Sequence, residues 1–287
     1  MVQDNKTVNN NINGINDYNY IDFSFDSITG LTYGKKLGGK KGISFESNPR
    51  KYEHVINEIK SNEKLSNDKI INQSPLNIKI NDFNKHKFDF VTCLGGTSIL
   101  DGIGETRTLL YKSLMLSSKF VYINQTNYDS DVFLFKKGFK TNISDWSRNT
   151  NHLTSNIYFN LLFDFYKKGY IEDYIIYYTI PIKDSKDSTI HPLNSPKNQP
   201  TFNDESHPAK NEHIKFKHIY KYLNVLITIN GYKKIDELLE RINNKKHILY
   251  DSRTGIYDDS TEEFIDKTNK KGKNIFGKVN KYLNSDI

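Results

Sequence analysis

Alternating apolar and polar residues open the folded part of the chain. Residues 20–25, Tyr-Ile-Asp-Phe-Ser-Phe, alternate with a period of two, as a β-strand does when one of its faces is buried. The next residues are rich in glycine and predict a turn, and residues 42–46, Gly-Ile-Ser-Phe-Glu, predict a second short strand. The residues that indicate the turn are Thr29, Gly30, Gly34, Gly38 and Gly39.

A helix is predicted to begin at Pro49. Proline has no amide hydrogen to leave unpaired in the first helical turn, so Pro49 fits there, with Asn48 or Ser47 as the N-cap. Apolar residues then recur three and four positions apart and form one stripe along the helix, which is typical of a helix that packs on a sheet. The stripe consists of Tyr52, Val55, Ile56 and Ile59.

Strands and helices continue to alternate up to about residue 123, in the order β-α-β-α-β-β-α-β from residue 20 onward. Strands that alternate with helices at these spacings pair in parallel through right-handed crossovers. The sequence therefore predicts an α/β fold with a Rossmann-like, doubly wound, mostly parallel sheet, in a domain that spans residues 19–183. The later elements of this order are strands over 76–80 and 88–93, a helix over 101–118 and a strand over 119–123.

A C-terminal α/β extension is predicted beyond this domain. Residues 184–213 contain four of the seven prolines among Ser, Asn and Asp, which indicates a linker or loop. Residues 214–287 then predict a C-terminal strand and basic helices that pack on the domain. The expected elements after residue 124 are a helix over 152–166, a strand over 174–182, a strand over 224–229, a helix over 235–242 and a Lys-rich helix around 275–283.

The composition indicates a protein of a reducing intracellular compartment, such as the cytoplasm. Residues 1–18 are polar and aperiodic, so we expect them to be disordered, and no signal peptide or membrane-spanning run is present. Cys93 is the only cysteine and ends an apolar strand, which predicts a core residue rather than a nucleophile. The net charge of +7 makes RNA or another polyanion a candidate partner, although an A/T-rich coding sequence explains the Lys surplus as well.

The second predicted strand and its flank resemble the class I S-adenosylmethionine-dependent methyltransferases. Residues 42–52 read GISFESNPRKY, and in that family an acid ends the second strand before an Asn-Pro and a helix. The resemblance implies that Glu46 grips the two ribose hydroxyls of S-adenosylmethionine, since a carboxylate offers two acceptors to a vicinal diol. The alternative is a carboxylate placed near a helix N-terminus without a ligand.

The glycine motif of that family is degenerate in this chain. The family pattern is an acid followed by Gly-x-Gly-x-Gly, and aligning Gly30 with the last glycine places Ser24 at the acid and Asp26 and Ile28 at the earlier glycines. The resemblance then implies a set of cofactor-binding residues that spans the first, second and fourth strands. The set is Asp26, Gly30, Gly34, Glu46 and Gly95.

The end of the fourth strand would lie beside the transferred methyl group, and there the usual catalytic acid is replaced by Leu94. Asp101 and Glu105 follow closely and are the candidate catalytic carboxylates for proton removal. The alternative is that both are acids at a helix start, favoured by the helix dipole. The histidines have no metal-ligand spacing, so we expect no metal site. Trp146 and the lysines between 267 and 281 are weaker candidates for contacts with a base or with phosphates.

Three functions are compatible with these patterns. The first is an active methyltransferase that acts on RNA or on a small hydroxyl compound. The second is a catalytically inactive, methyltransferase-fold binding or stimulatory subunit that works with a catalytic partner, as in an mRNA-capping complex. Residues 105–114 and 129–133 resemble the small subunit of poxvirus-type mRNA capping enzymes. The third is an unrelated Rossmann-like protein with a different nucleotide or none.

Overall fold

The computed structural model describes most of the chain between residues 14 and 257. Residues 1–257 form one compact unit, and residues 258–287 form a second unit that lies outside the described part. The predicted Lys-rich helix around 275–283 lies in this second unit, and Trp146 lies in a separate range of the first unit that is not described. The described ranges are 14–83, 87–141, 151–195, 210, 213–229, 231–242 and 246–257.

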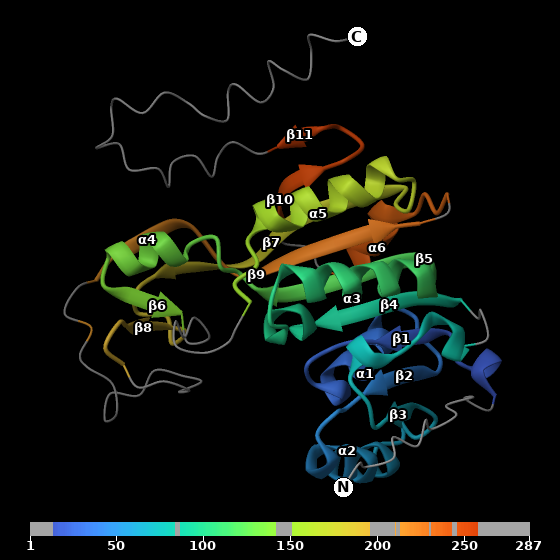
Figure 1. The fold of residues 1–287 in the computed structure, drawn as a ribbon. Helices are drawn as coiled ribbons and strands as arrows, with labels where there is room; N and C mark the ends of the chain where they lie inside the picture. The colour runs from blue at the N-terminus through green and yellow to red at the C-terminus, as the bar shows by residue number, and fades with distance from the viewer. Residues whose placement is uncertain are drawn as a thin grey trace, which may run out of the picture. The chain divides into compact units, whose positions relative to one another are not determined.

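A nine-stranded sheet organises the fold, in the order β11-β10-β7-β9-β5-β4-β1-β2-β3 (Figure 1). The strands from β3 to β5 pair in parallel, whereas β9 pairs antiparallel with both β5 and β7, and β10 and β11 continue the antiparallel side. The strands are β1 (Tyr20–Asp22), β2 (Gly42–Phe45), β3 (Lys69–Ile71), β4 (Phe88–Leu94), β5 (Ser117–Thr126), β7 (Asp173–Asp184), β9 (Lys215–Thr228), β10 (Lys246–Asp251) and β11 (Ile256–Tyr257).

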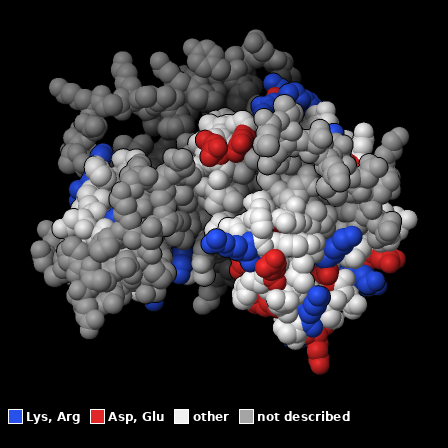
Figure 2. Space-filling model, turned by 60° about the horizontal axis from the view of Figure 1, so that its bottom comes forward, with Lys and Arg blue, Asp and Glu red and all other residues white. Residues whose placement is uncertain are grey.

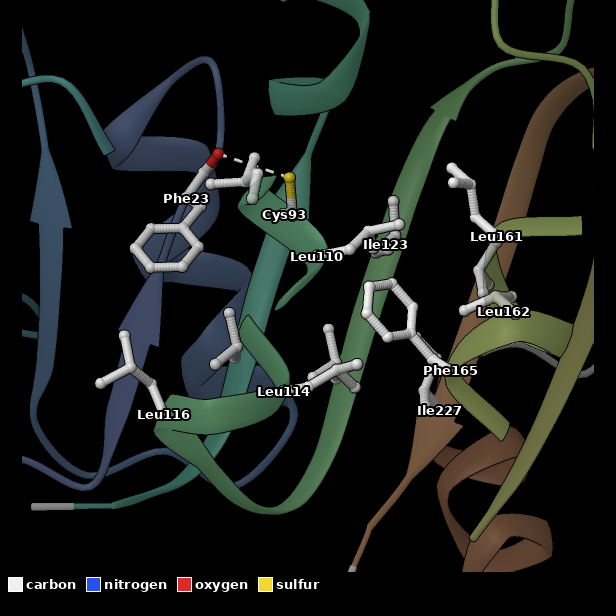
Figure 3. Packing of buried hydrophobic residues seen from close by; sticks show 14 of the residues in the cluster. Phe23, Cys93, Leu110, Leu114, Leu116, Ile123, Leu161, Leu162, Phe165 and Ile227 are labelled. Carbon is white, nitrogen blue, oxygen red and sulfur yellow. Dashed lines mark hydrogen bonds between the residues drawn. The ribbon is translucent and has the colours of Figure 1, made fainter. Parts of the chain in front are cut away.

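Helices cover both faces of this sheet, so the predicted doubly wound, Rossmann-like α/β class is confirmed. Leu110 of α3 (Ile103–Leu116) and Phe165 of α5 (Ser155–Lys167) belong to the core on one face (Figure 3). The core on the other face takes side chains from α1 (Ser27–Lys36), α2 (Pro49–Ser61) and α6 (Ile235–Ile242). Burial of these two apolar layers is the main driving force for the fold.

Two strands of the sheet, β7 and β9, extend beyond the other strands and lie next to a smaller group of helices and strands. The ends of β7 and β9 run beside a two-stranded antiparallel sheet of β6 (Phe139–Thr141) and β8 (Ile190–Pro192), next to the short helix α4 (Asp131–Lys136) (Figure 1). β8 lies inside the segment 184–213, for which a linker or loop was predicted. Part of that segment thus belongs to the same compact unit as the sheet.

Several local predictions were wrong, each for a visible reason. A turn was predicted ahead of the first helix, but the glycine-rich segment is itself that helix, α1, because the Asp26 carboxylate caps it by accepting bonds from the Ile28 amide and the Thr29 hydroxyl. The predicted strand 76–80 consists of two 3-10 turns, at Pro75–Asn77 and Ile80–Phe83. Residues 1–18 were expected to be disordered, but residues 15–17 form a 3-10 turn, Ile15–Asp17, in which the Ile15 side chain is buried in the core.

No helix of the described residues is long and apolar enough to cross a membrane.

Candidate functional site

The carboxyl ends of β1, β2, β4 and β5 meet at one edge of the sheet, because these strands are parallel. In open α/β sheets this is the edge at which ligands bind. The residues that follow the strand ends lie at this edge: the loop 23–26 after β1, Glu46 after β2, Gly95 after β4 and the segment from Asn127 after β5.

Glu46 directly follows β2 and is half-buried at this edge. Its backbone amide donates to the Ile71 carbonyl at 3.0 Å, which ties it to the end of β3. One carboxylate oxygen, Oε1, accepts the Asn48 amide at 2.8 Å. Asn48 in turn caps α2 by accepting the amides of Arg50 and Lys51, so the predicted Asn48-Pro49 helix start is confirmed. This local frame fixes the carboxylate at the strand end.

Asp22, the last residue of β1, is fully buried and was not predicted as a site residue. Its carboxylate accepts hydrogen bonds from three hydroxyls: Ser24 at 2.6 Å, Ser44 of β2 at 2.8 Å and Thr92 of β4 at 2.7 Å. Burial raises the pKa of Asp22 to about 6, and the three hydroxyl donors offset part of that rise. β1 thus ends in an acid, Asp22. The predicted alignment instead placed Ser24, two residues later, at the position of the acid.

The loop after β1 stays joined to the end of β4. The amides of Phe23 and Phe25 donate to the carbonyls of Thr92 and Leu94, at 2.8 and 2.9 Å. The Ser24 hydroxyl oxygen also accepts the Leu94 amide at 2.7 Å. Gly96 lies so close to this loop that a Cβ there would overlap the Phe23 carbonyl. The loop 23–25 is therefore bonded to the end of β4 along its length.

The structure separates the predicted cofactor-binding glycines. Gly95 follows β4 with a left-handed φ of 69°, at the ligand edge, and Asp26 caps α1 nearby. Gly30 and Gly34 instead lie inside α1, buried against β1. A Cβ at Gly30 would overlap the Asp22 carboxylate, and one at Gly34 would overlap the Tyr20 ring. These two glycines allow α1 to approach β1 closely and do not form a turn.

The two predicted catalytic carboxylates lie at the start of α3. Glu105 Oε2 accepts the Asp101 amide at 2.9 Å, and Asp101 itself is exposed. This arrangement is typical of an acid that satisfies a free amide in the first turn of a helix. The bond therefore supports the helix-start alternative for Glu105, and no contact of these residues points to a bound group.

A polar cluster that the sequence did not predict lies beyond the end of β5. Asp131 Oδ2 is 3.1 Å from His152 Nδ1, and the His152 ring stacks on Tyr128 with 4.4 Å between the ring centroids. Asp129 accepts a hydrogen bond from the Tyr178 hydroxyl and another from the Ser155 amide at 2.8 Å. Burial raises the pKa of Asp129, which the Tyr178 hydrogen bond partly offsets.

Backbone and side-chain hydrogen bonds attach this polar cluster to the ligand edge. The Asn151 amide donates to the Ser98 carbonyl at 2.9 Å, in the 3-10 turn Gly96–Ile99 that follows β4. Gln125 Nε2 of β5 donates to the Leu153 carbonyl at 2.6 Å. His152 lies between these two anchored residues and keeps a fifth of its side chain exposed. An imidazole held by a buried carboxylate can act as a general base.

Cys93 is a core residue, as predicted. Its thiol is buried, lies 3.5 Å from the Phe23 carbonyl (Figure 3), and burial raises its pKa to about 12. A thiol of this kind is almost entirely protonated at neutral pH, and the thiolate is the reactive form. Cys93 therefore cannot serve as a nucleophile in this conformation.

No protein-family model and no curated protein matches the sequence. Solved structures with a similar fold include a possible histamine N-methyltransferase from Thermotoga maritima, 12% identical over 74% of this chain and 83% of that one, TM-score 0.44. The methyltransferase domain of a bacterial Hen1 (CtHen1) is 11% identical over 74% and 91%, TM-score 0.45. Magnesium protoporphyrin IX methyltransferase from Synechocystis, with bound S-adenosylhomocysteine, is 9% identical over 74% of both chains, TM-score 0.39. At these identities the likeness concerns the fold alone.

Proposed function

We propose that this protein binds S-adenosylmethionine at the carboxyl edge of β1, β2 and β4, with Glu46 on the ribose, as a methyltransferase of RNA or of a small hydroxyl compound. The observation that carries the proposal is the fixed, half-buried Glu46 carboxylate at the end of β2. A carboxylate at this place can accept both hydroxyls of a ribose, and strand ends on either side of β1 form the crevice where nucleotides bind.

The topology of the sheet supports the same proposal. The order β3-β2-β1-β4-β5 is shared by doubly wound nucleotide-binding domains. Here β9 runs antiparallel to β5 and is inserted between β5 and β7.

The residues of the edge fit the cofactor on one side better than on the other. The nucleoside side fits, because Glu46 is held at the strand end with part of its surface exposed. The side next to β1 lacks the glycine turn of the usual binding mode, since the loop 23–25 is bonded to β4. When bound, the cofactor supplies an electrophilic methyl group. In this proposal the His152–Asp131 pair receives the proton that the acceptor hydroxyl loses.

Calorimetric titration with S-adenosylmethionine tests the proposal. We expect micromolar binding that Glu46→Ala weakens by about 10- to 100-fold, because hydrogen bonds to a charged group contribute about 1.5–3 kcal/mol. Glu53→Ala, which removes an exposed carboxylate from the neighbouring helix α2, is the matched control and should bind like the unmodified protein. Absence of binding at millimolar cofactor would overturn the proposal.

One observation favours a second candidate function, a methyltransferase-fold subunit without its own chemistry. The closed junction between the loop 23–25 and β4 would leave the methionine part of the cofactor without its usual place. Such a subunit should form a complex of fixed stoichiometry with a catalytic partner, detectable by size-exclusion chromatography with light scattering. A lone monomer that binds S-adenosylmethionine would exclude this function, and a stable complex without cofactor binding would favour it.

A further inference from the structure

We propose that the group of elements beyond the sheet edge binds single-stranded nucleic acid. We call this group the basic arm and define it as residues 127–141, 180–195 and 213–222, which include α4, β6, β8 and the outer ends of β7 and β9. The proposal does not depend on cofactor binding at Glu46, because Glu46 lies outside the basic arm; Asp131 of the arm also belongs to the polar cluster described above. The net charge of the chain suggested a polyanionic partner, and the proposal places the binding site for that partner on the basic arm.

The basic arm carries more positive than negative side chains. Its residues include eight lysines, four aspartates and no glutamate. In the view of Figure 2, the described residues of this part show lysine atoms without acidic ones, whereas the part that carries α1 and α2 shows both. The lysines of the arm are Lys136, Lys137, Lys140, Lys183, Lys186, Lys215, Lys217 and Lys221.

None of the four aspartates forms an ion pair with these lysines within the described ranges. Asp129 and Asp131 belong to the polar cluster with Tyr178 and His152. Asp184 pairs with His213 at 3.4 Å, and Asp187 accepts the amide and hydroxyl of Thr189. The acidic groups of the arm thus have partners other than lysine ion pairs, although Lys186 also acts on Asp184 electrostatically, and the lysines exceed the aspartates by eight to four.

Six of the eight lysines are exposed, and none of the six has an ion-pair partner among the described residues. In the body of the sheet, by comparison, some lysines are paired: Lys35 with Asp68 at 2.7 Å and Lys119 with Asp89 at 2.8 Å. Unpaired cations on one surface sum to a positive potential that attracts phosphate chains. The six are Lys136, Lys137, Lys183, Lys186, Lys215 and Lys217.

Exposed apolar and aromatic side chains lie among these lysines. On α4, Phe135 is 54% exposed and Val132 is 62% exposed. Lys137 Nζ lies 6.0 Å from the centre of the Phe133 ring, and Lys221 Nζ lies 5.8 Å from that of Tyr222. Aromatic rings between cations are typical of surfaces that stack unpaired bases while holding the backbone, which favours a single strand over a duplex or an acidic protein.

Fluorescence anisotropy with a labelled single-stranded RNA of about 20 nucleotides tests the proposal across a range of salt concentrations. Two charge-reversal pairs, Lys136→Glu with Lys137→Glu and Lys215→Glu with Lys217→Glu, should each weaken binding at least about tenfold at low salt. Each pair should also lower the salt slope by about 1.4, since each phosphate contact to a single strand contributes about 0.7. Phe135→Ala should weaken binding with an unchanged slope, because stacking is not ionic.

The matched control reverses the same charge at Lys60 and Lys64, two exposed lysines in and after α2, and should leave both affinity and slope unchanged. Circular dichroism verifies that every variant is folded, and calorimetry with S-adenosylmethionine separates a failure here from a failure of the proposed function. Equal losses in the control and arm variants would overturn the assignment. So would displacement of the RNA by poly-glutamate, or equal affinity for duplex RNA, because the first indicates a protein ligand and the second excludes stacking.

Discussion

At the scale of single residues, the buried carboxylate of Asp22 holds the centre of the sheet together. It accepts hydroxyl hydrogen bonds from the loop after β1, from β2 and from β4. A buried carboxylate is expensive when charged, and hydrogen bonds to it recover part of that cost. The three hydroxyl donors explain why an acid is tolerated at a fully buried position between two apolar layers.

The raised pKa of Asp22 predicts a specific pH dependence of stability. The folded pKa of about 6 exceeds the ordinary value of 3.8, so this residue's contribution is fully present below about pH 4 and is lost as pH rises through about 6. Its size is about 3 kcal/mol. Chemical denaturation of the unmodified protein and Asp22→Asn at several pH values should show the variant gaining that much relative stability between pH 4 and 7. Parallel curves would contradict the prediction.

Residues next to strand ends were predictable from the sequence, and residues joined only by the fold were not. Glu46 and Gly95 directly follow strands whose alternation is visible in the sequence, and the structure places both at the ligand edge. An alignment with Gly30 as the last glycine of a turn shifts the acid to Ser24, so it does not predict Asp22. The His152–Asp131 pair has no common element or short spacing, so local patterns could not indicate it.

At the scale of elements, α1 shows how glycines can serve packing rather than a turn. Gly30 faces the Asp22 carboxylate and Gly34 faces Tyr20, whose hydroxyl donates to the Leu31 carbonyl at 3.0 Å. The helix begins because Asp26 caps it, and it tolerates the glycines because β1 packs where their side chains would be. In the sequence, a run of glycines after a strand indicates a turn equally well.

Two alanine substitutions in helices should therefore act in opposite directions. Gly30→Ala places a methyl group into the Asp22 carboxylate and should destabilise the protein by about 1–3 kcal/mol. Gly104→Ala in α3 has no atom within 4 Å and should stabilise it by up to about 1 kcal/mol, through helix propensity. Thermal unfolding of both variants checks the signs. A shared sign would show that propensity or local packing alone dominates.

Short strands were the elements that could not be predicted from the sequence. β3 has three residues, Lys69–Ile71, too few for a pattern to emerge. The nearby alternation at 76–80 indicated a strand, but side chains there bond to the local backbone: Ser74 accepts the Leu76 amide and Asp82 accepts the Lys79 amide. Such bonds compete with a sheet ladder and favour tight turns. Long elements such as α2 and β4 were predicted because their patterns extend over several turns or pleats.

At the scale of the whole molecule, Cys93 reports on the integrity of the core. Its thiol is buried between the sheet and α3, with a pKa of about 12, and it is the only cysteine in the chain. A thiol-specific disulfide reagent should therefore label the native protein only as fast as the core opens, and it should label the denatured protein at once. Labelling of native protein at the rate of a small-molecule thiol would contradict the burial of Cys93.

The parallel half of the sheet was predictable because its strands and helices alternate locally, but the antiparallel half was not. The position of β9 between β5 and β7 depends on residues far apart in the sequence: Tyr122 of β5 is opposite Leu226, and Tyr177 of β7 is opposite Asn224. The side chain of Asn224 bonds to the Tyr122 hydroxyl at 2.8 Å and to Thr179 at 3.0 Å. A periodic pattern shows that β9 is a strand without showing its neighbours.

The insertion of β9 has a consequence for how the chain is made. About 100 residues separate β5 from its partner strand, and synthesis at about 5–20 residues per second delays that partner by about 5–20 s. During this interval the emerging β5, with its apolar run Phe-Val-Tyr-Ile, is an open edge beside an otherwise complete parallel sheet. The last third of the chain therefore decides whether the nascent protein closes on itself or pairs with another copy.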